Sequence, residues 1–566
     1  MENLRNEKAQ TNIENDREEN NINMDRAKNI YGNEIKISVY KKSCLAKKKL
    51  AKKYGDDEKA TLYTSISDNE HIGKLLGVKD IYVGKKNPVG EEASTRVEEV
   101  MPAAGKVAPK KIYGQAIDKE KGLIVGNIRM GFGHYRISMA IASAANHMGY
   151  TPYWMDLNGF PDTTSTKVIS EQNKMYSLGS RLSKNPIFNK LVWEPLNYEG
   201  FRALTYNSGD QKRAELMAPV YRDIPKDIPV VGTHCWPAQA AIHAGMKYVV
   251  NAVPDNWPMA LHLSEGSIHT VQCHYAYQGY RILNGMNKNK VNKEMPKDAL
   301  VYTGHYIDHE LVANIEADCK ARIDRKNRCE PIRFLLTIGG AGAQKEIFAA
   351  IIKYLLPYIK NEEAVLYINV GDYKNVWYEL LKEIPDMKSL AREHFDNWEE
   401  TLEFAQGALG NAIACGEQVS GGQGRDEGKT ADGQVKAYGN AADGKVLGIH
   451  GFYHSNIFEA VYCTNLLMRS CDVLVTKPSE LAFYPVPKLF IKRVGKHEMW
   501  GAIHSCEIGD GTLECRDIPH TLQMIKMFLK DDEFLIDMCN NIMKNKEAGI
   551  YDGAYKVVEL AMGMRK

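Results

Sequence analysis

A glycine-rich turn with a histidine directly behind it is the first stretch of this sequence that could do chemistry. Gly131 and Gly133 stand between an apolar run at 123–125 and apolar residues with helical spacing at 137–145, and His134 follows at once. The pattern predicts a buried parallel strand, a loop and a helix. Backbone N–H groups and the positive end of the helix dipole meet at such a loop, which suits an anion or a developing negative charge.

This first loop matches neither of the two common phosphate-binding motifs. A dinucleotide fingerprint requires glycine where Arg136 stands, and no lysine follows to complete a P-loop. His134 could still act, because an imidazole with an ordinary pKa of about 6.5 is a suitable base for a hydroxyl group near neutral pH. A histidine that only caps its own turn is the alternative. Asp255, which follows another predicted strand, is the rival base.

A second glycine loop follows the apolar run 333–338 and precedes a predicted helix at 345–358. Its N–H groups would neutralise a diphosphate without a metal, whereas a tight turn without a ligand is the alternative. The glycines concerned are Gly339, Gly340 and Gly342. Farther on, Lys477 offers a point charge for phosphate and Glu480 offers two acceptor oxygens for vicinal hydroxyls. A solvated lysine and an acid at the start of a helix are the alternatives.

Strands alternate with helices in both large parts of the chain, which predicts two parallel α/β sheets. Two Rossmann-like domains would then face each other across a cleft, with ligands at the carboxyl ends of the strands. The expected organisation is a disordered tail (1–34), a small α/β or basic extension with a linker (35–110), a first Rossmann-like domain (111–310), a second (320–515) with a flexible insertion (416–448), and C-terminal helices (516–566). Alternation at Ile35, Ile37 and Val39 predicts a strand, and residues 373–405 are predicted to be helical with an interruption at Pro385.

Length and composition narrow the class of protein. The 566 residues exceed one hydrophobic core and predict two main domains, and a net charge of +2 argues against nucleic acid as a partner. No apolar run approaches the roughly 18 residues of a spanning helix, and the first residues do not resemble a secretory signal. Eleven cysteines without a CxxC pair predict reduced thiols and a cytoplasmic protein.

Seven lysines lie on the segment 41–53, which predicts a basic helix. Docking on an anionic membrane surface, at the inner face of the membrane, and a merely solvated helix are both open interpretations. Histidine and cysteine are also frequent between residues 234 and 309, and His305 and His309 have the spacing of one helical turn. Because no CxxC or HExxH motif is present, we expect no metal.

Taken in order, the motifs resemble those of GT-B glycosyltransferases, and among them the group of monogalactosyldiacylglycerol synthase and the peptidoglycan N-acetylglucosaminyltransferase. The likeness extends over about residues 120–515. The stretches that carry it are Gly131-Phe132-Gly133-His134, Thr233-His234, Val253-Pro254-Asp255, Gly304-His305, Thr337-Ile338-Gly339-Gly340, Gly451-Phe452-Tyr453, Asp472 to Lys477, Glu480 and His497-Glu498.

The resemblance implies an inverting transfer of a sugar from a nucleotide donor, UDP-linked, to a hydroxyl acceptor, for which a lipid is one candidate. It implies that the first domain binds the acceptor and the second the donor, with the nucleotide sugar as substrate and no further cofactor. His134 would be the acceptor-side base or orienter. By the same resemblance, Phe452 lies beside the donor base, Glu480 on the donor ribose, and His497 and Glu498 near the sugar.

Two other functions remain open from the sequence. A nucleotide-sugar epimerase of the same fold would bind the donor without a channel for an acceptor. A catalytically silent nucleotide-sugar-binding or scaffold protein is the other alternative, because the stretch from Lys477 to Glu480 is shorter than the glycine-rich loop of the family.

Overall fold

The first of two parallel sheets contains the histidine-bearing loop. The computed structural model describes residues 25–85, 116–182, 185–288, 290–338, 344–410 and 446–565. Eight strands follow the order β10-β9-β8-β7-β5-β6-β4-β3, and only β3 and β4 are antiparallel neighbours. Their bounds are β3 Leu62–Asp68, β4 Lys79–Lys85, β5 Gly122–Asn127, β6 Thr151–Asp156, β7 Val230–Gly232, β8 Val249–Ala252, β9 Ile268–Val271 and β10 Leu300–Tyr302.

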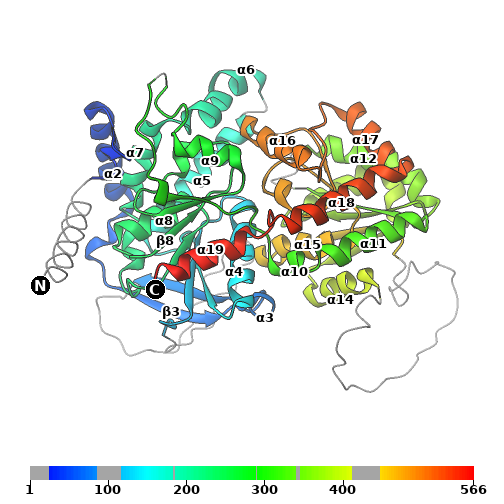
Figure 1. Cartoon of the computed structure of the whole chain (residues 1–566), viewed down its shortest axis with the longest axis horizontal. Helices are drawn as coiled ribbons and strands as arrows, with labels where there is room; N and C mark the ends of the chain where they lie inside the picture. The colour runs from blue at the N-terminus through cyan, green and yellow to red at the C-terminus, as the bar shows by residue number, and fades with distance from the viewer. Residues whose placement is uncertain are drawn as a thin grey trace, which may run out of the picture.

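Helices cover both faces of this sheet (Figure 1). Ile124 of β5 belongs to one hydrophobic cluster, whereas its neighbours Leu123 and Val125 belong to another. Such alternation follows from the pleat, which sends successive side chains to opposite faces. The strands are therefore buried on both sides, as parallel strands usually are.

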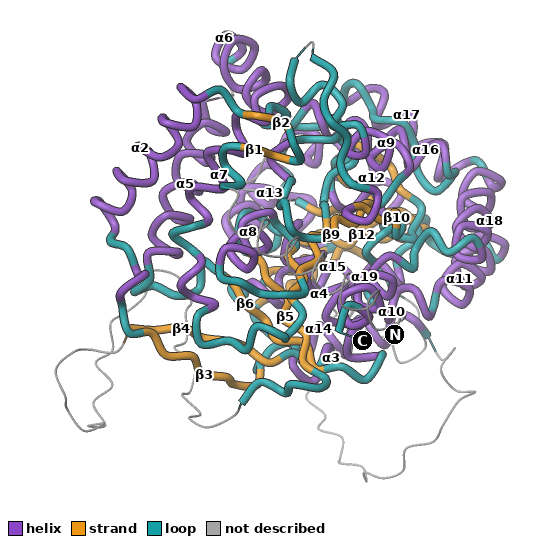
Figure 2. The backbone as a smooth tube through the Cα atoms, turned by 60° about the vertical axis from the view of Figure 1, so that its left-hand side comes forward, coloured by secondary structure: helices purple, strands orange, loops and turns teal. Residues whose placement is uncertain are grey.

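The sequence assigned residues 35–110 to a separate extension, but part of this segment belongs to the first sheet. β4 pairs with β6, with Lys79 opposite Tyr153, and β3 forms the outer edge of the sheet (Figure 2). The other expected domain bounds remain predictions. The tail up to residue 24, the linker 86–110 and the insertion up to residue 445 lie outside the described residues, as do Gly339, Gly340 and Gly342.

The strand predicted around Ile37 is wrong. Helix α2 spans Ile37–Tyr54, after a two-residue strand β2 at Asn33–Glu34. Ile35 is buried while Ile37 is 57% exposed, so the alternation does not mark one face of a sheet. The lysine-rich sequence that follows favours a helix and extends it back over Ile37. The basic helix predicted at 41–53 is confirmed as part of α2.

The second sheet has six parallel strands in the order β13-β14-β12-β11-β15-β16. Their bounds are β11 Ile332–Thr337, β12 Ala364–Asn369, β13 Ala391–Phe395, β14 Gly448–Tyr453, β15 Val473–Thr476 and β16 Lys488–Phe490. Strand β13 lies within the segment 373–405 that was predicted to be helical. Helices α13 (Lys374–Glu383) and α14 (Trp398–Leu409) flank it. Pairing with β14, a partner distant in sequence, overrides the local helical pattern.

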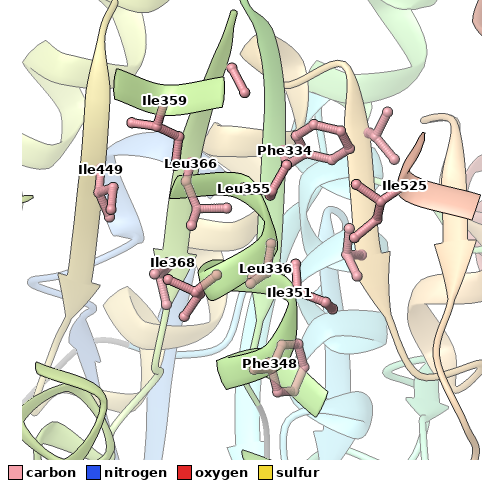
Figure 3. Packing of buried hydrophobic residues seen from close by; sticks show 14 of the residues in the cluster. Phe334, Leu336, Phe348, Ile351, Leu355, Ile359, Leu366, Ile368, Ile449 and Ile525 are labelled. Atoms are coloured by element: carbon pink, nitrogen blue, oxygen red, sulfur yellow. The ribbon is translucent and has the colours of Figure 1, made fainter. Parts of the chain in front are cut away.

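Helix α12 (Lys345–Lys360) covers the centre of the second sheet (Figure 3). Phe348, Ile351, Leu355 and Ile359 lie on one helical face, since residues three or four apart share a face. They pack on apolar side chains of β11 and β12, which are Phe334, Leu336, Leu366 and Ile368. Burial of each such side chain stabilises the fold by about 1.5–3 kcal/mol, so this contact is a principal source of stability for the second domain.

The last helix of the chain returns to the first domain. Helix α18 (Asp532–Glu547) packs against α11 (Ile315–Asn327) in the second domain. After it, α19 (Gly553–Gly563) crosses over and packs on α4 (Gly133–His147), beside β7 and β8 (Figures 1 and 2). The chain therefore connects the two domains twice. Two Rossmann-like α/β domains arranged in this way confirm the predicted GT-B fold class.

A buried polar network also joins the two domains. Arg136 of α4 donates through Nη1 to Asn465 Oδ1 at 2.5 Å and to the Val461 carbonyl at 3.2 Å, both on α15 (Ile457–Ser470). Asn465 Nδ2 donates in turn to Asp308 Oδ1 at 3.2 Å. Burial raises the pKa of Asp308 to about 7, with Glu310 acting in the same direction and Arg136 opposing it.

Replacement of Asp308 by Asn should change how stability depends on pH. Between the ordinary pKa of 3.8 and the folded value of about 7, the folded protein holds a proton that the unfolded chain releases. The free energy of unfolding of the wild type should therefore fall as pH rises through this window, by at most about 4 kcal/mol at roughly 1.4 kcal/mol per pH unit. Asp308→Asn should remove this decrease.

Urea unfolding at about pH 5 and about pH 8 measures the effect. Asp386→Asn is the matched control, because this exposed carboxylate of the second domain pairs with Lys360 and is not among the groups that influence Asp308. The assignment is wrong if Asp308→Asn and the wild type lose the same free energy between the two pH values.

Candidate functional site

His134 lies where the first strand of the first domain gives way to its helix. It is the second residue of α4, and its Nδ1 lies 2.8 Å from the Thr233 carbonyl oxygen, after β7. A carbonyl oxygen only accepts, so Nδ1 carries the hydrogen and the neutral ring keeps a lone pair on Nε2. Burial lowers the pKa of His134 below the ordinary value for histidine. The ring is thus able to accept a proton.

The segment after β8 contributes a carboxylate and a second histidine. Asp255 Oδ2 accepts a hydrogen bond from His262 Nε2 at 3.0 Å. His262 is almost completely buried, whereas 37% of the Asp255 side chain is exposed. Burial alone would raise the pKa of Asp255, but the hydrogen bond from His262 and the electrostatic influence of His497 hold it well below its ordinary value. Asp255 is therefore ionised near neutral pH.

The glycine loop of the first domain is in contact with the second domain. A Cβ atom on Gly133 would lie 3.3 Å from Glu480 Cδ, so the absent side chain leaves room for this carboxylate. Glu480 begins a short helical turn, η9 (Glu480–Phe483). Nearby, Arg129 Nη2 pairs with Asp372 Oδ2 of the second domain at 2.8 Å. Gly131 has a different role, since its φ of +82° is a backbone conformation that favours glycine.

Lys477 and Glu498, both predicted donor ligands, bind each other. Lys477 follows β15, and its Nζ forms an ion pair with Glu498 Oε1. Glu498 Oε2 also accepts from the backbone N–H groups of Val494 at 2.8 Å and Gly495 at 3.0 Å. Burial would lower the pKa of Lys477, but the charges of Glu498 and Glu480 raise it above its ordinary value. The lysine is charged, and Glu498 holds both the lysine and the loop at 494–495.

His497 brings the second domain close to Asp255. It lies on the short turn η10 (Lys496–Glu498), and its charge contributes to the low pKa of Asp255. The residues that the structure brings together at the domain junction are His134, Asp255, Gly133, Lys477, Glu480, His497 and Glu498. All of them were candidates from the sequence, although they are spread over more than 360 positions of the chain.

Phe452 was predicted beside the donor base, but it belongs to the core. Its side chain is completely buried on β14, where the His394 ring stacks on it at 4.7 Å with an interplanar angle of 10°. The motif Gly451-Phe452-Tyr453 is the end of β14, which lies between β13 and β12, and Phe404 of α14 packs against Phe452. The Phe452 side chain is therefore not available to a ligand.

Several residues at the junction had no distinct signal in the sequence. His262 becomes notable only through its bond to Asp255. Tyr176, on α5 (Thr164–Leu182), lies close enough to Lys477, Glu498 and Asp255 for their charges to act on it, so it also lies near the site. Asn256, Trp257 and Trp500 belong to the same junction. Contacts in the folded protein, and no pattern in the sequence, identify these residues.

The histidine and cysteine side chains of residues 234–309 that the structure describes do not form a metal site. Within the ranges that the structure describes, no three His, Cys, Asp or Glu side chains are arranged as metal ligands. His305 does not share a helix with His309, because it lies before α10 (His309–Ala313) and bonds instead to the Phe483 carbonyl and to His504.

The imidazole of His134 should stay neutral below the pH at which an ordinary histidine becomes protonated. NMR titration of the ring, assigned with the His134→Gln variant, should place its pKa below about 6.5, because burial disfavours the charged form. His71 provides an internal contrast, since its bond to Glu459 raises its pKa. A measured pKa of His134 equal to or above that of His71 would show that burial does not control the protonation of His134.

Comparison with known proteins gives two family matches and several distant structural ones. Residues 29–282 match a family described as a domain of unknown function, DUF6937, and residues 295–420 and 425–562 match another, DUF6938. None of the curated proteins matches the chain.

Among solved structures, the chain is similar to a UDP-GlcNAc 2-epimerase from Neisseria meningitidis bound to UDP-GlcNAc, with 11% identity, 77% of this chain and 98% of that chain covered, and a TM-score of 0.39. It is similar to an alpha,alpha-trehalose 6-phosphate synthase from Burkholderia multivorans, with 10% identity, 79% and 98% covered, and a TM-score of 0.36. A third is the S. aureus MnaA–UDP complex, with 10% identity, 78% and 95% covered, and a TM-score of 0.38. These likenesses are distant ones of fold alone.

Proposed function

We propose that this protein is an inverting glycosyltransferase that moves a sugar from a nucleotide donor, UDP-linked, to a hydroxyl acceptor. One observation carries the proposal. A neutral histidine of the first domain, His134, lies at the same junction as Lys477 and Glu480 of the second domain, because Glu480 approaches the loop that precedes His134. Transfer needs these groups together: a base for the acceptor, a cation for the leaving diphosphate and a ligand for the sugar nucleotide.

The second domain is the proposed donor site. Lys477 and Glu480 follow β15 at its carboxyl end, where ligands of parallel sheets usually bind. Thr337 Oγ1, at the end of β11, donates to Thr476 Oγ1, at the end of β15, at 2.9 Å. The second glycine loop, which follows β11, therefore begins beside the residues that follow β15. Gly339, Gly340 and Gly342 remain predicted ligands of the diphosphate. Lys477 would add a positive charge close to the diphosphate.

On the acceptor side, His134 is the proposed base. The acceptor oxygen would attack the anomeric carbon from the side opposite the diphosphate, whose bond to that carbon breaks, and the acceptor proton would pass to His134 Nε2. The charge of Asp255 raises the pKa of His134, and so favours the imidazolium that this step creates. Asp255 itself is a weak base, because its own pKa is held low.

Association with a membrane remains a separate proposal. None of the described helices has the length and apolar character needed to cross a bilayer. On α2, Lys47 pairs with Glu215 at 2.6 Å and Lys53 with Glu171 at 2.9 Å, so the fold neutralises part of the basic charge. The other lysines of 41–53 could hold the protein at the cytoplasmic face of an anionic membrane, where each is worth about 1 kcal/mol.

Glu480→Ala should weaken binding of a UDP-sugar by about 1–3 kcal/mol, the range for loss of a hydrogen bond to a charged group. Isothermal titration calorimetry with UDP and with a panel of UDP-sugars measures the change. Glu379→Ala is the control, because this carboxylate is exposed on α13. Equal affinities for the Glu480 variant and the wild type would remove Glu480 from the donor site.

His134→Ala should reduce transfer about 10²–10⁴-fold, the usual effect of losing a general base, while donor affinity stays unchanged. Asp255→Asn should reduce it less. Analysis of the products by NMR follows the reaction and also tests the alternatives. If Asp255→Asn abolishes turnover and His134→Ala does not, the two roles are exchanged. An epimerised nucleotide sugar formed without acceptor would identify an epimerase, and binding without turnover a silent protein.

A further inference from the structure

Four aromatic rings from both domains stack at the domain junction. Trp257 stacks on Tyr198 with centroids 4.6 Å apart and on Trp500 with centroids 5.4 Å apart, each at an interplanar angle of 12°. Tyr275 stacks on Trp500 at 4.2 Å and 9°. Trp500 belongs to α16 (Met499–Glu507) of the second domain, and the other three rings to the first. We call these four residues the aromatic stack.

Buried polar atoms beside the aromatic stack have no partner among the described residues. They are Asn256 Oδ1 and Nδ2, Trp257 Nε1, Trp500 Nε1, His262 Nδ1 and His497 Nδ1. Asn256 is 4% exposed and Trp257 5%. A buried hydrogen-bonding group that stays unsatisfied destabilises the folded protein, so several of them close together indicate a place where something else binds.

The atoms with missing partners belong to one place. Asn256 stands between Asp255 and Trp257 in the chain. His262 is hydrogen-bonded to Asp255 at 3.0 Å, and the charge of His497 acts on the same carboxylate. The ring of Trp500 lies on that of Trp257. Two short segments, 255–262 and 497–500, thus meet beside the proposed acceptor-side residues.

The missing partners define the chemistry of the ligand. The indole N–H groups of Trp257 and Trp500 require acceptors, whereas the Asn256 side chain requires both a donor and an acceptor. A phosphate or carboxylate supplies acceptors alone and would be repelled by the ionised Asp255, and an alkyl chain satisfies none of these groups. Several hydroxyl groups, each able to donate and accept, satisfy all of them.

We infer that Asn256, Trp257 and Trp500 form the binding site for a neutral polyhydroxylated group, a sugar ring or a polyol, that serves as the acceptor. The inference rests on the proposed function, because it identifies the acceptor of that reaction. One hydroxyl of this group would lose its proton to His134 as its oxygen forms the new bond to the anomeric carbon. The group can be a free sugar or the head group of a glycolipid, since both present the same hydroxyls.

Titration of the full chain with glucose, N-acetylglucosamine and myo-inositol tests the inference. Binding is followed through tryptophan fluorescence and the indole N–H signals of Trp257 and Trp500. An alkyl glucoside, compared with a fatty acid of equal chain length, distinguishes a glycolipid head group from a free sugar. We expect saturable binding of at least one hydroxylated probe, which shifts both indole signals, and no binding of inorganic phosphate.

Two variants carry the test. Asn256→Ala should weaken binding of that probe about ten-fold. Trp500→Phe, which keeps a stacking ring and removes one N–H, should weaken it several-fold and keeps the test valid if Asn256→Ala does not fold. Trp398→Phe, on α14 of the second domain, controls for fluorescence and should bind normally.

The affinity for UDP, measured in parallel, should be the same in Asn256→Ala, Trp500→Phe and the wild type. If no form of the protein binds UDP, the proposed donor site is wrong, and this result is distinct from a failure of the acceptor site. The inference is overturned if no hydroxylated probe binds, if the variants bind as tightly as the wild type, or if phosphate or the fatty acid binds instead with the same dependence on Asn256.

Discussion

The position of α4 between the two domains is the constraint on which the rest of the structure depends. Its N-terminus carries the glycine loop and His134, its first turn also places Arg136 in contact with α15, and α19 packs along it. Only 2% of Arg136 is exposed. Burial of a guanidinium group destabilises the fold unless the group is hydrogen-bonded. Because its partners belong to the second domain, the histidine and the donor-side residues keep a defined relative position.

Opposite charges at the junction explain why each candidate group has its protonation state. Asp255 is ionised because it accepts a hydrogen bond from His262 and lies near His497, and His134 is neutral because burial outweighs the attraction of Asp255 and Glu480. Lys477 stays charged between Glu498 and Glu480. The site therefore contains a neutral base, a fixed anion and a fixed cation. This distribution suits a reaction in which a proton and a diphosphate leave in different directions.

The aromatic stack is connected to the segment 494–498 of the second domain. Trp500 follows Glu498 by two residues, and Glu498 binds both Lys477 and the backbone at 494–495. Stacking of Trp500 on Trp257 thus holds the segment that carries His497 against the first domain. A ligand beside these rings would meet residues of both domains at once, and acceptor binding would be sensitive to the relative position of the domains.

The sequence by itself determined the repeated strand–loop–helix units, the two-domain fold class and most of the residues at the junction. Those features are local: apolar runs, glycines with helical segments behind them, and polar residues after strands. The strand β13, the membership of β3 and β4 in the first sheet and the burial of Phe452 were decided by pairing between distant segments. The His262–Asp255 bond, between residues seven positions apart, depends on how the segment after β8 folds. The aromatic stack again joins distant segments. Such contacts join residues up to hundreds of positions apart, and no local pattern in one sequence specifies which of them meet.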